Sequence, residues 1–459
     1  MTVFENVRVL SFNPPTVSAP TDVAVDGGLI AAIGNGLAAK YPQAERVAGG
    51  GRFLSPGLVC SHTHLYSALA RGMLVSIQPS KDFAQQLKNL WWRLDRAIDL
   101  PILEASALAG CADAVLAGVT SLVDHHASPE AIDGSLTVIR KAYEEVGVRG
   151  LLCYETTDRN GMDGAKAGVK ENIRFAKEVA ADRAAGKAVL TEAAIGAHAP
   201  FTIGDETLGL LADAVKSTGR GFHIHVAEDK YDAVDSRYRF GLDPLVRLDK
   251  AGLLDERTII GHGLWLSESE VELLSARDGF LAHNARSNMN NAVGYNTLLT
   301  KHRNVVLGTD GMGADMLEEF KFAVFRHRES VGPWWPGEFL ACLDRGNRLI
   351  ERYAAAEPRA PGPRTSGPAS NKNDPRVFGK VEVGAAADLV LWDYESPTPL
   401  VGDNVAGHLA FGLSSRSVGS VMVAGRFAVR DKKALFDAEK IGAKGREQAS
   451  RLWKRMEDR

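Results

Sequence analysis

Histidines are the reactive side chains that the sequence groups most closely, and the first pair stands in the stretch GLVCSHTHLY. His62 and His64 are two residues apart, a spacing that puts both side chains on one face of an extended strand. Two neutral imidazoles on one face provide half of a metal site. Two histidines near a loop would show the same spacing without binding a metal, so the pair alone leaves both interpretations open.

The elements that would position these side chains alternate along the middle of the chain. β-rich runs are followed by amphipathic stretches, a pattern typical of βα units and a parallel sheet. Helical periodicity is clear in SLTVIRKAYEEV and in ETLGLLADAVKST. We expect eight strands, which begin at residues 53, 118, 148, 189, 221, 257, 279 and 304. Eight such units over about 270 residues predict an α/β fold, a distorted TIM (β/α)8 barrel.

The histidines recur where these strands end, which is the end of a barrel that carries the reactive groups. His62 and His64 close the first strand, and Asp310 closes the eighth. The other histidines at or near strand ends are His125, His126, His198, His223, His225, His262 and His283. A core histidine bonded to backbone would explain any one of them, but it does not explain a series at one end of the barrel. The pattern therefore predicts a metal site there.

Both ends of the chain contain short strands and turns instead of βα units. Each end alone is too short to bury a core, so we predict a small composite β-sandwich formed from residues 1–55 and 377–435. The barrel would then comprise residues 56–376, with a loop rich in Pro, Gly and Ser at residues 357–376. Residues 436–459 predict a charged, exposed C-terminal helix.

The composition narrows the class of protein. The 459 residues carry a formal net charge of −3, with 24% charged and 45% hydrophobic residues. No basic run indicates nucleic acid or an anionic membrane as a partner, and we find neither a signal peptide nor an apolar run of about 20 residues. The four cysteines, Cys60, Cys111, Cys153 and Cys342, show no paired spacing. We therefore expect a soluble, cytoplasmic protein.

Five motifs spread over the barrel segment resemble those of one superfamily. PGLVCSHTH, HVAE, GHGLWL, AHNARSNMNNAVG and LGTDGMGADM are similar to the motifs of the amidohydrolase superfamily, in its chlorohydrolase and aminohydrolase branch. CYETTDRNGMDGA and HNARSNMNNAVG resemble the SsnA-type aminohydrolases still more closely. The resemblance extends over nearly the whole chain, including GKVEVGAAADLVLWD near the C-terminus. It is specific for the superfamily and much less specific for the substrate.

The resemblance implies one divalent metal ion per chain, zinc by preference, with iron or manganese as alternatives. Its ligands would be His62, His64, His225 and Asp310. Members of the superfamily with two ions bridge them with a carboxylated lysine on the fourth strand, and VLTEAAIGAHAP contains no lysine. A site with three imidazoles, one carboxylate and an open position is typical of catalytic metals.

The resemblance also implies roles for neighbouring residues. Glu228, three residues after His225, would carry protons between water and the substrate, and His262 would orient the attacking water or stabilise developing charge. Candidate substrate contacts are His198, Arg286, Asn288 and Trp91. A loop contact for His198 and helix packing for Trp91 are the alternatives.

Three further residues lie near the predicted ligands in the sequence, and each leaves two interpretations open. We expect Cys60 to be a buried structural thiol, although a soft group two residues from a ligand could also influence the choice of metal. His125 and His126 are expected at the mouth of the pocket, with a purely structural role as the alternative.

The predicted activity is hydrolytic removal of an amino group from a purine-like or pyrimidine-like nitrogen heterocycle by hydroxide generated at the metal. Hydrolysis of a C–Cl bond or of a cyclic amide at the same site is an alternative. A protein of another class, a scaffold that keeps the fold without catalysis, is expected to lose ligands, and this sequence retains them. The expected partners are a small heterocyclic substrate and further copies of the chain in a homo-oligomer.

Overall fold

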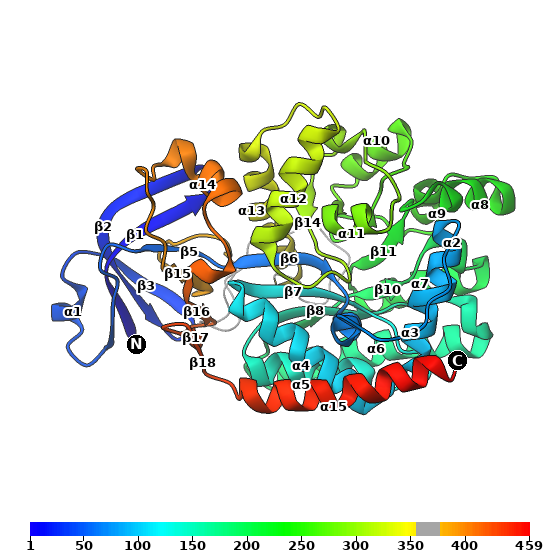
Figure 1. The fold of residues 1–459 in the computed structure, drawn as a ribbon, viewed down its shortest axis with the longest axis horizontal. Helices are drawn as coiled ribbons and strands as arrows, with labels where there is room; N and C mark the ends of the chain where they lie inside the picture. Colours follow the sequence, from blue (N-terminus) through cyan, green and yellow to red (C-terminus); the bar gives the residue numbers. More distant parts are fainter. Residues whose placement is uncertain (355–376) are drawn as a thin grey trace.

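The computed structural model describes residues 1–354 and 377–459 and contains two parts that lie side by side (Figure 1). One part is a β-sheet built from both ends of the chain, and the other is a barrel surrounded by helices. The loop predicted at residues 357–376, and with it the predicted end of the barrel, lies outside the described residues. No helix within the described ranges is long and apolar enough to cross a membrane.

Strands from the two ends of the chain share one nine-stranded sheet. They are β1 (Thr2–Phe12), β2 (Pro15–Asp26), β3 (Leu29–Gly34), β4 (Glu45–Ala48), β5 (Phe53–Pro56), β15 (Leu389–Trp392), β16 (Val418–Val423), β17 (Arg426–Arg430) and β18 (Lys433–Ala434). β5 pairs in parallel with β1 and antiparallel with β15, which joins the first strands of the chain to the last. Phe4, Leu54 and Leu391 belong to one buried apolar cluster, so both ends contribute to the same core. The expected β-sandwich takes the form of this connected sheet, and the domain limits themselves stay a prediction.

The barrel strands form a four-stranded and a five-stranded parallel sheet. They are β6 (Leu58–Thr63), β7 (Val119–His126), β8 (Arg149–Tyr154), β9 (Thr191–Ala193), β10 (Ile195–Ala197), β11 (Phe222–Val226), β12 (Ile259–His262), β13 (Phe280–His283) and β14 (Val305–Leu307). Isolated bridges between Thr63 and Asp310 and between Thr156 and Ala197 connect the two sheets. The predicted fourth strand is divided into β9 and β10 at Ala194, which explains nine segments in a barrel of eight strands.

The barrel strands are covered on both faces, which is why they appear in the sequence as nearly continuous apolar runs. Val123, Leu151 and Phe280 belong to an apolar cluster that also contains residues of other barrel strands. His62, His64, His225 and His262 lie at the ends of these strands or directly after them, so the polar groups converge at one end of an apolar interior.

Most helices surround the barrel strands, whereas α1 (Leu37–Lys40) packs against β1, β2 and β3 of the terminal sheet (Figure 1). The helices are α1 (Leu37–Lys40), α2 (Phe83–Gln86), α3 (Trp92–Ala97), α4 (Leu100–Leu116), α5 (Ser135–Val146), α6 (Gly161–Ala184), α7 (Asp205–Thr218), α8 (Lys230–Phe240), α9 (Pro244–Lys250), α10 (Glu268–Ala276), α11 (Ala285–Asn290), α12 (Met316–Glu329), α13 (Pro336–Ala354), α14 (Val405–Phe411) and α15 (Ala438–Glu457). α5 and α7 match the two stretches in which the sequence shows helical periodicity.

The C-terminal helix α15 is present, but it is not exposed on all sides. Asp437 caps its first turn by accepting a hydrogen bond from the backbone N–H of Lys440 at 2.9 Å. Leu452 and Met456 are fully buried, and the indole Nε1–H of Trp453 donates to the carbonyl oxygen of Leu69 at 2.9 Å. The helix runs along α4 and contacts α3 (Figure 1) because its apolar residues recur on one face.

Candidate active site

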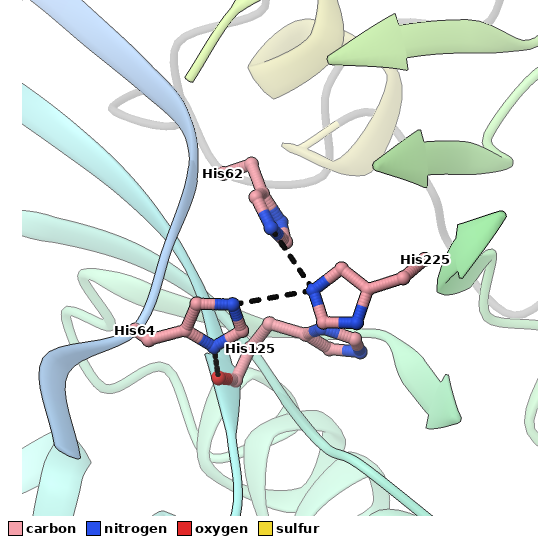
Figure 2. A group of neighbouring side chains, drawn as sticks. All are labelled: His62, His64, His125 and His225. Atoms are coloured by element: carbon pink, nitrogen blue, oxygen red, sulfur yellow. Dashed lines mark hydrogen bonds between the residues drawn. The ribbon is translucent and has the colours of Figure 1, made fainter. Parts of the chain in front are cut away.

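Three imidazole rings converge at the ends of β6 and β11, and Figure 2 shows their nitrogens facing one another. The Nε2 atom of His225 lies 3.2 Å from Nε2 of His62 and 3.2 Å from Nε2 of His64. Gly261 of β12 allows this approach, since a Cβ atom there would lie 3.0 Å from the His225 ring and 3.5 Å from the His62 ring. The two histidines of HxH therefore do lie on one face and meet the predicted strand-five ligand.

Asp310, which follows β14, completes the group. Its Oδ1 atom lies 2.7 Å from Nε2 of His64 and 3.6 Å from Nε2 of His62. The hydroxyl of Ser287 donates to the other carboxylate oxygen, Oδ2. The four predicted ligands thus belong to two overlapping groups of close donor atoms, one of His62, His64, His125 and His225 and one of His62, His225, His262 and Asp310.

The donor set fits a divalent cation. The three facing nitrogens are the Nε2 atoms of His62, His64 and His225. A hydrogen on one of them can satisfy only one neighbour, so without a cation the lone pairs that remain on these buried rings would repel one another. Burial lowers the pKa of His62 to about 4 and that of His225 well below its ordinary value, which keeps both rings neutral and able to bind metal. Burial also acts on His64, but Asp310 and Glu155 outweigh it and raise the pKa well above its ordinary value. The cluster therefore attracts positive charge.

Glu228 lies beside this cluster, on the cavity side. Its Oε2 atom is 3.5 Å from Nε2 of His262, and its Oε1 atom accepts a hydrogen bond from Nδ2 of Asn291 at 3.1 Å. Burial raises the pKa of the Glu228 carboxyl to about 7, with Asp310 adding to the effect and His262 opposing it. A carboxyl group that titrates near neutral pH can both accept and return a proton, which suits general acid–base catalysis.

His262 is held by Asn288. Nδ1 of the His262 ring lies 2.8 Å from Oδ1 of Asn288, so the ring donates from Nδ1 and turns Nε2 toward Glu228. Nε2 has no hydrogen-bond partner among the described residues and lies 4.0 Å from Oδ2 of Asp310. This orientation places Nε2 of His262 beside the carboxylates of Glu228 and Asp310.

Three residues at strand ends of the site adopt a left-handed backbone conformation that is rare outside glycine. The φ angles are 50° at Ala227, 70° at His262 and 53° at Asp310. Such conformations cost about 1–3 kcal/mol each and persist where the surrounding structure imposes them. Ala227 directly precedes Glu228. At each of the three strand ends, the left-handed residue therefore sets the direction of a candidate reactive side chain, which is Glu228, His262 or Asp310.

A cavity borders the cluster, and aromatic side chains line much of it. They are Tyr66, Phe83, Trp91, Trp92, Phe201 and Tyr231. His64, His225, Glu228 and Asp310 line the same cavity, so a flat apolar ligand could contact the aromatic side chains while it approached the polar cluster.

The structure brings two of the four predicted substrate contacts to the cavity. Trp91 and His198 line it. Asn288 instead orients His262, as described above. Arg286 does not line the cavity. The guanidinium group of Arg286 forms ion pairs with Glu318 and Glu319 and donates a hydrogen bond to the carbonyl oxygen of Gly313. Its charge is therefore neutralised within the protein.

Several charged residues that line this cavity were not identified from the sequence, among them Glu155, Arg159 and Asp95. Glu155, which follows β8 directly, is buried, and its Oε1 atom lies 3.1 Å from Nδ1 of His64. Arg159 forms an ion pair with Asp95 at 2.9 Å and lies over the ring of Trp92, 4.6 Å from its centroid. Burial raises the pKa of Asp95 to about 6 in spite of Arg159. The position of Glu155 directly after a barrel strand was the signal that could have identified it.

His125 and His126 do not lie at the mouth of the pocket. Both are fully buried, because β7 continues through them. Nδ1 of His125 lies 3.4 Å from Nε2 of His225, and Nε2 of His126 lies 2.8 Å from the hydroxyl oxygen of Ser128.

Cys60 is a buried thiol, as expected. Its sulfur lies 3.2 Å from Oγ1 of Thr309, and burial raises its pKa. A thiol that stays protonated in this environment has a packing role.

The chain was compared with known families and proteins. The model of the Amidohydrolase family matches residues 53–343. A 5-methylthioadenosine/S-adenosylhomocysteine deaminase of Thermococcus sibiricus is 25% identical over 419 residues, which cover 88% of each chain. An adenosine deaminase from Xanthomonas campestris with bound zinc has a similar structure, with a TM-score of 0.79 and 22% identity over 99% of this chain and 98% of that chain.

The atrazine chlorohydrolase TrzN from Arthrobacter aurescens, complexed with zinc, shows the same fold with a TM-score of 0.78. It is 20% identical and covers 98% of this chain and 100% of that chain. These similarities confirm the predicted superfamily, its chlorohydrolase and aminohydrolase branch and the predicted fold. Because the family model matches well over half of the chain, the protein belongs to the amidohydrolase family.

Proposed function

We propose that the protein is a metal-dependent aminohydrolase that removes an amino group from a purine-like heterocycle. The observation that carries this proposal is the position of Glu228, whose carboxyl group lies beside the converging ligands and lines the aromatic cavity. Ammonia leaves a heterocycle only after protonation, and Glu228 is the group best placed to supply the proton. The deaminase activity of the Thermococcus relative supports the same reaction class.

We further propose that His62, His64, His225 and Asp310 hold one divalent ion, zinc by preference. When bound, such an ion supplies Lewis acidity that makes water nucleophilic near neutral pH. Glu228 would take a proton from the attacking water and pass it to a ring nitrogen or the leaving amine. His262, fixed by Asn288, would orient that water, and Trp91 and His198 would contact the substrate ring.

Cleavage of a C–Cl bond is the second candidate, because the chlorohydrolase TrzN shares the fold and chloride requires no proton to leave. The presence of a buried carboxyl group with a pKa near 7 favours the deaminase. A scaffold without catalysis is disfavoured. The nitrogens of His62, His64 and His225 face one another in a buried position, which is costly unless they bind a metal. The cytoplasmic location and homo-oligomeric state remain predictions.

The test is an ammonia-release screen with the zinc-loaded protein. Adenine nucleosides modified at the 5′ position, free aminopurines and aminopyrimidines form the three substrate groups, and chloro-substituted analogues of the same rings are assayed in parallel for chloride. We expect ammonia from at least one purine group. Chloride release without ammonia from any amino compound would refute the deaminase proposal and favour the second candidate.

A further inference from the structure

His223 is the other histidine of the HIH stretch, and the proposed ligand set does not use it. It lies on β11, two residues before His225, and is fully buried. Its Nε2 atom is 2.9 Å from Nδ1 of His62, which is also fully buried. The two rings meet nearly edge to face, with centroids 5.0 Å apart and an interplanar angle of 72°.

The direction of this hydrogen bond follows from the metal site proposed above. Nε2 of His62 faces the other ligand atoms, and a neutral imidazole that binds metal through Nε2 carries its hydrogen on Nδ1. Nδ1–H of His62 therefore donates, and Nε2 of His223 accepts. A single tautomer of each ring satisfies this arrangement.

The other nitrogen of His223 has a partner as well. With Nε2 accepting, the hydrogen of His223 lies on Nδ1, which is 3.7 Å from the sulfur of Cys153. The Cys153 thiol donates in turn to the carbonyl oxygen of Asp124 at 3.8 Å. Burial raises the pKa of Cys153 well above its ordinary value, which keeps the S–H donor in place. Both nitrogens of His223 are thus used, which explains why only His225 of the HIH stretch faces the ligand cluster.

We propose that His223 is a positioning residue that fixes the tautomer and orientation of His62 and thereby strengthens metal binding. This inference rests on the proposed ligand set. The usual partner of a metal-bound histidine is a carboxylate, a backbone carbonyl or water, and here a neutral imidazole fills that place inside the barrel. One ring nitrogen each of His125 and His223 and the sulfur of Cys153 lie within 4.8 Å of one another, but a cation bound among them would break the hydrogen bond from His62 to His223.

The experiment uses two amide substitutions that differ only in reach. In His223→Gln the side-chain carbonyl oxygen comes close to the position of Nε2 and can accept from His62, whereas the shorter side chain of His223→Asn cannot reach it. Zinc affinity of the metal-free protein is measured by competition with a chromophoric chelator. We expect His223→Asn to bind zinc about 10- to 100-fold more weakly than the wild type and His223→Gln to recover most of that loss.

Two further variants make the outcome decisive. His283→Leu removes a buried histidine of β13 whose ring nitrogens have no hydrogen-bond partner among the described residues, and it should leave zinc affinity unchanged. Equal affinities for His223→Asn and His223→Gln, or an equal loss in His283→Leu, would overturn the positioning role. His62→Ala tests the ligand set itself: if its affinity matches the wild type, the proposed metal site fails, whereas a loss there with no effect at His223 refutes only the inference.

Discussion

Glu228→Gln separates proton transfer from the other properties of the site. Glutamine has the size of glutamate, and its carbonyl oxygen can still accept the hydrogen bond that Asn291 donates to Glu228 at 3.1 Å. It cannot accept a proton from water or return one to a leaving amine. The four proposed metal ligands are untouched, so metal content and substrate binding should stay close to those of the wild type.

The expected loss is large. General acid–base catalysis contributes about 10²–10⁴-fold in rate, which corresponds to about 2.7–5.4 kcal/mol of the activation barrier. The loss should appear in kcat and in kcat/KM alike, because proton transfer stabilises the transition state and not the bound substrate. Glu206→Gln, at an exposed glutamate of α7, serves as the matched control and should leave ammonia release unchanged.

The assay compares release of ammonia and of chloride from matched amino- and chloro-substituted rings, together with elemental analysis of each variant. Deamination should fall in Glu228→Gln far more than dechlorination, because chloride leaves without a proton. If the variant loses its metal, Glu228 is a ligand and the reasoning is wrong. If it deaminates at the rate of the wild type, another group supplies the proton.

Four other outcomes are expected. Elemental analysis of the purified protein should give one divalent ion per chain, and two tightly bound ions would contradict the ligand set. Because burial raises the pKa of Glu228 to about 7, its base form is lost as pH falls, so kcat/KM should drop about tenfold per pH unit below that value, and Glu228→Gln should lack this limb. Trp91→Ala should lower kcat/KM by roughly 5- to 150-fold, the equivalent of about 1–3 kcal/mol of ring stacking, chiefly through KM. Arg286→Met should destabilise the fold by about 3–5 kcal/mol in denaturant titration, since it leaves Glu319 buried without its partner; a raised KM with unchanged stability would show instead that Arg286 contacts substrate.

The barrel could be predicted because its strands and helices have strong, separate periodicities. The segment Ser135–Val146 alternates apolar and polar residues with helical spacing, and α5 has those limits. The division of the first predicted strand into β5 and β6 was missed, although Pro56 and Gly57 mark the break between them. Pairing with β15, more than 300 residues away in the sequence, assigns β5 to the other sheet, and no local pattern contains that information.

The convergence of the proposed metal ligands could be expected for a related reason. HxH on a strand, a histidine at a later strand end and an aspartate after the last strand are local patterns with a direct geometric consequence. The roles of Asn288 and Arg286 were not predictable, because each depends on which neighbour its side chain meets after folding. Asn288 meets His262, and Arg286 meets two carboxylates of α12.

The strained backbone at the strand ends depends both on the local sequence and on contacts made after folding. His262 and Asp310 occupy left-handed conformations that glycine would adopt at lower cost, and Ala227 does the same directly before Glu228. The barrel strands β11 and β12 are buried and paired on both sides, and the buried strand β14 pairs with β13 while Asp310 forms a bridge to Thr63, so the adjoining residues have little freedom to relax. At Ala227 the methyl group is fully buried in the main apolar core, and this packing helps to offset the cost of the conformation. Retention of a Cβ atom there restricts the backbone that carries Glu228, which fits a site where the direction of one carboxylate decides whether a proton reaches the leaving group.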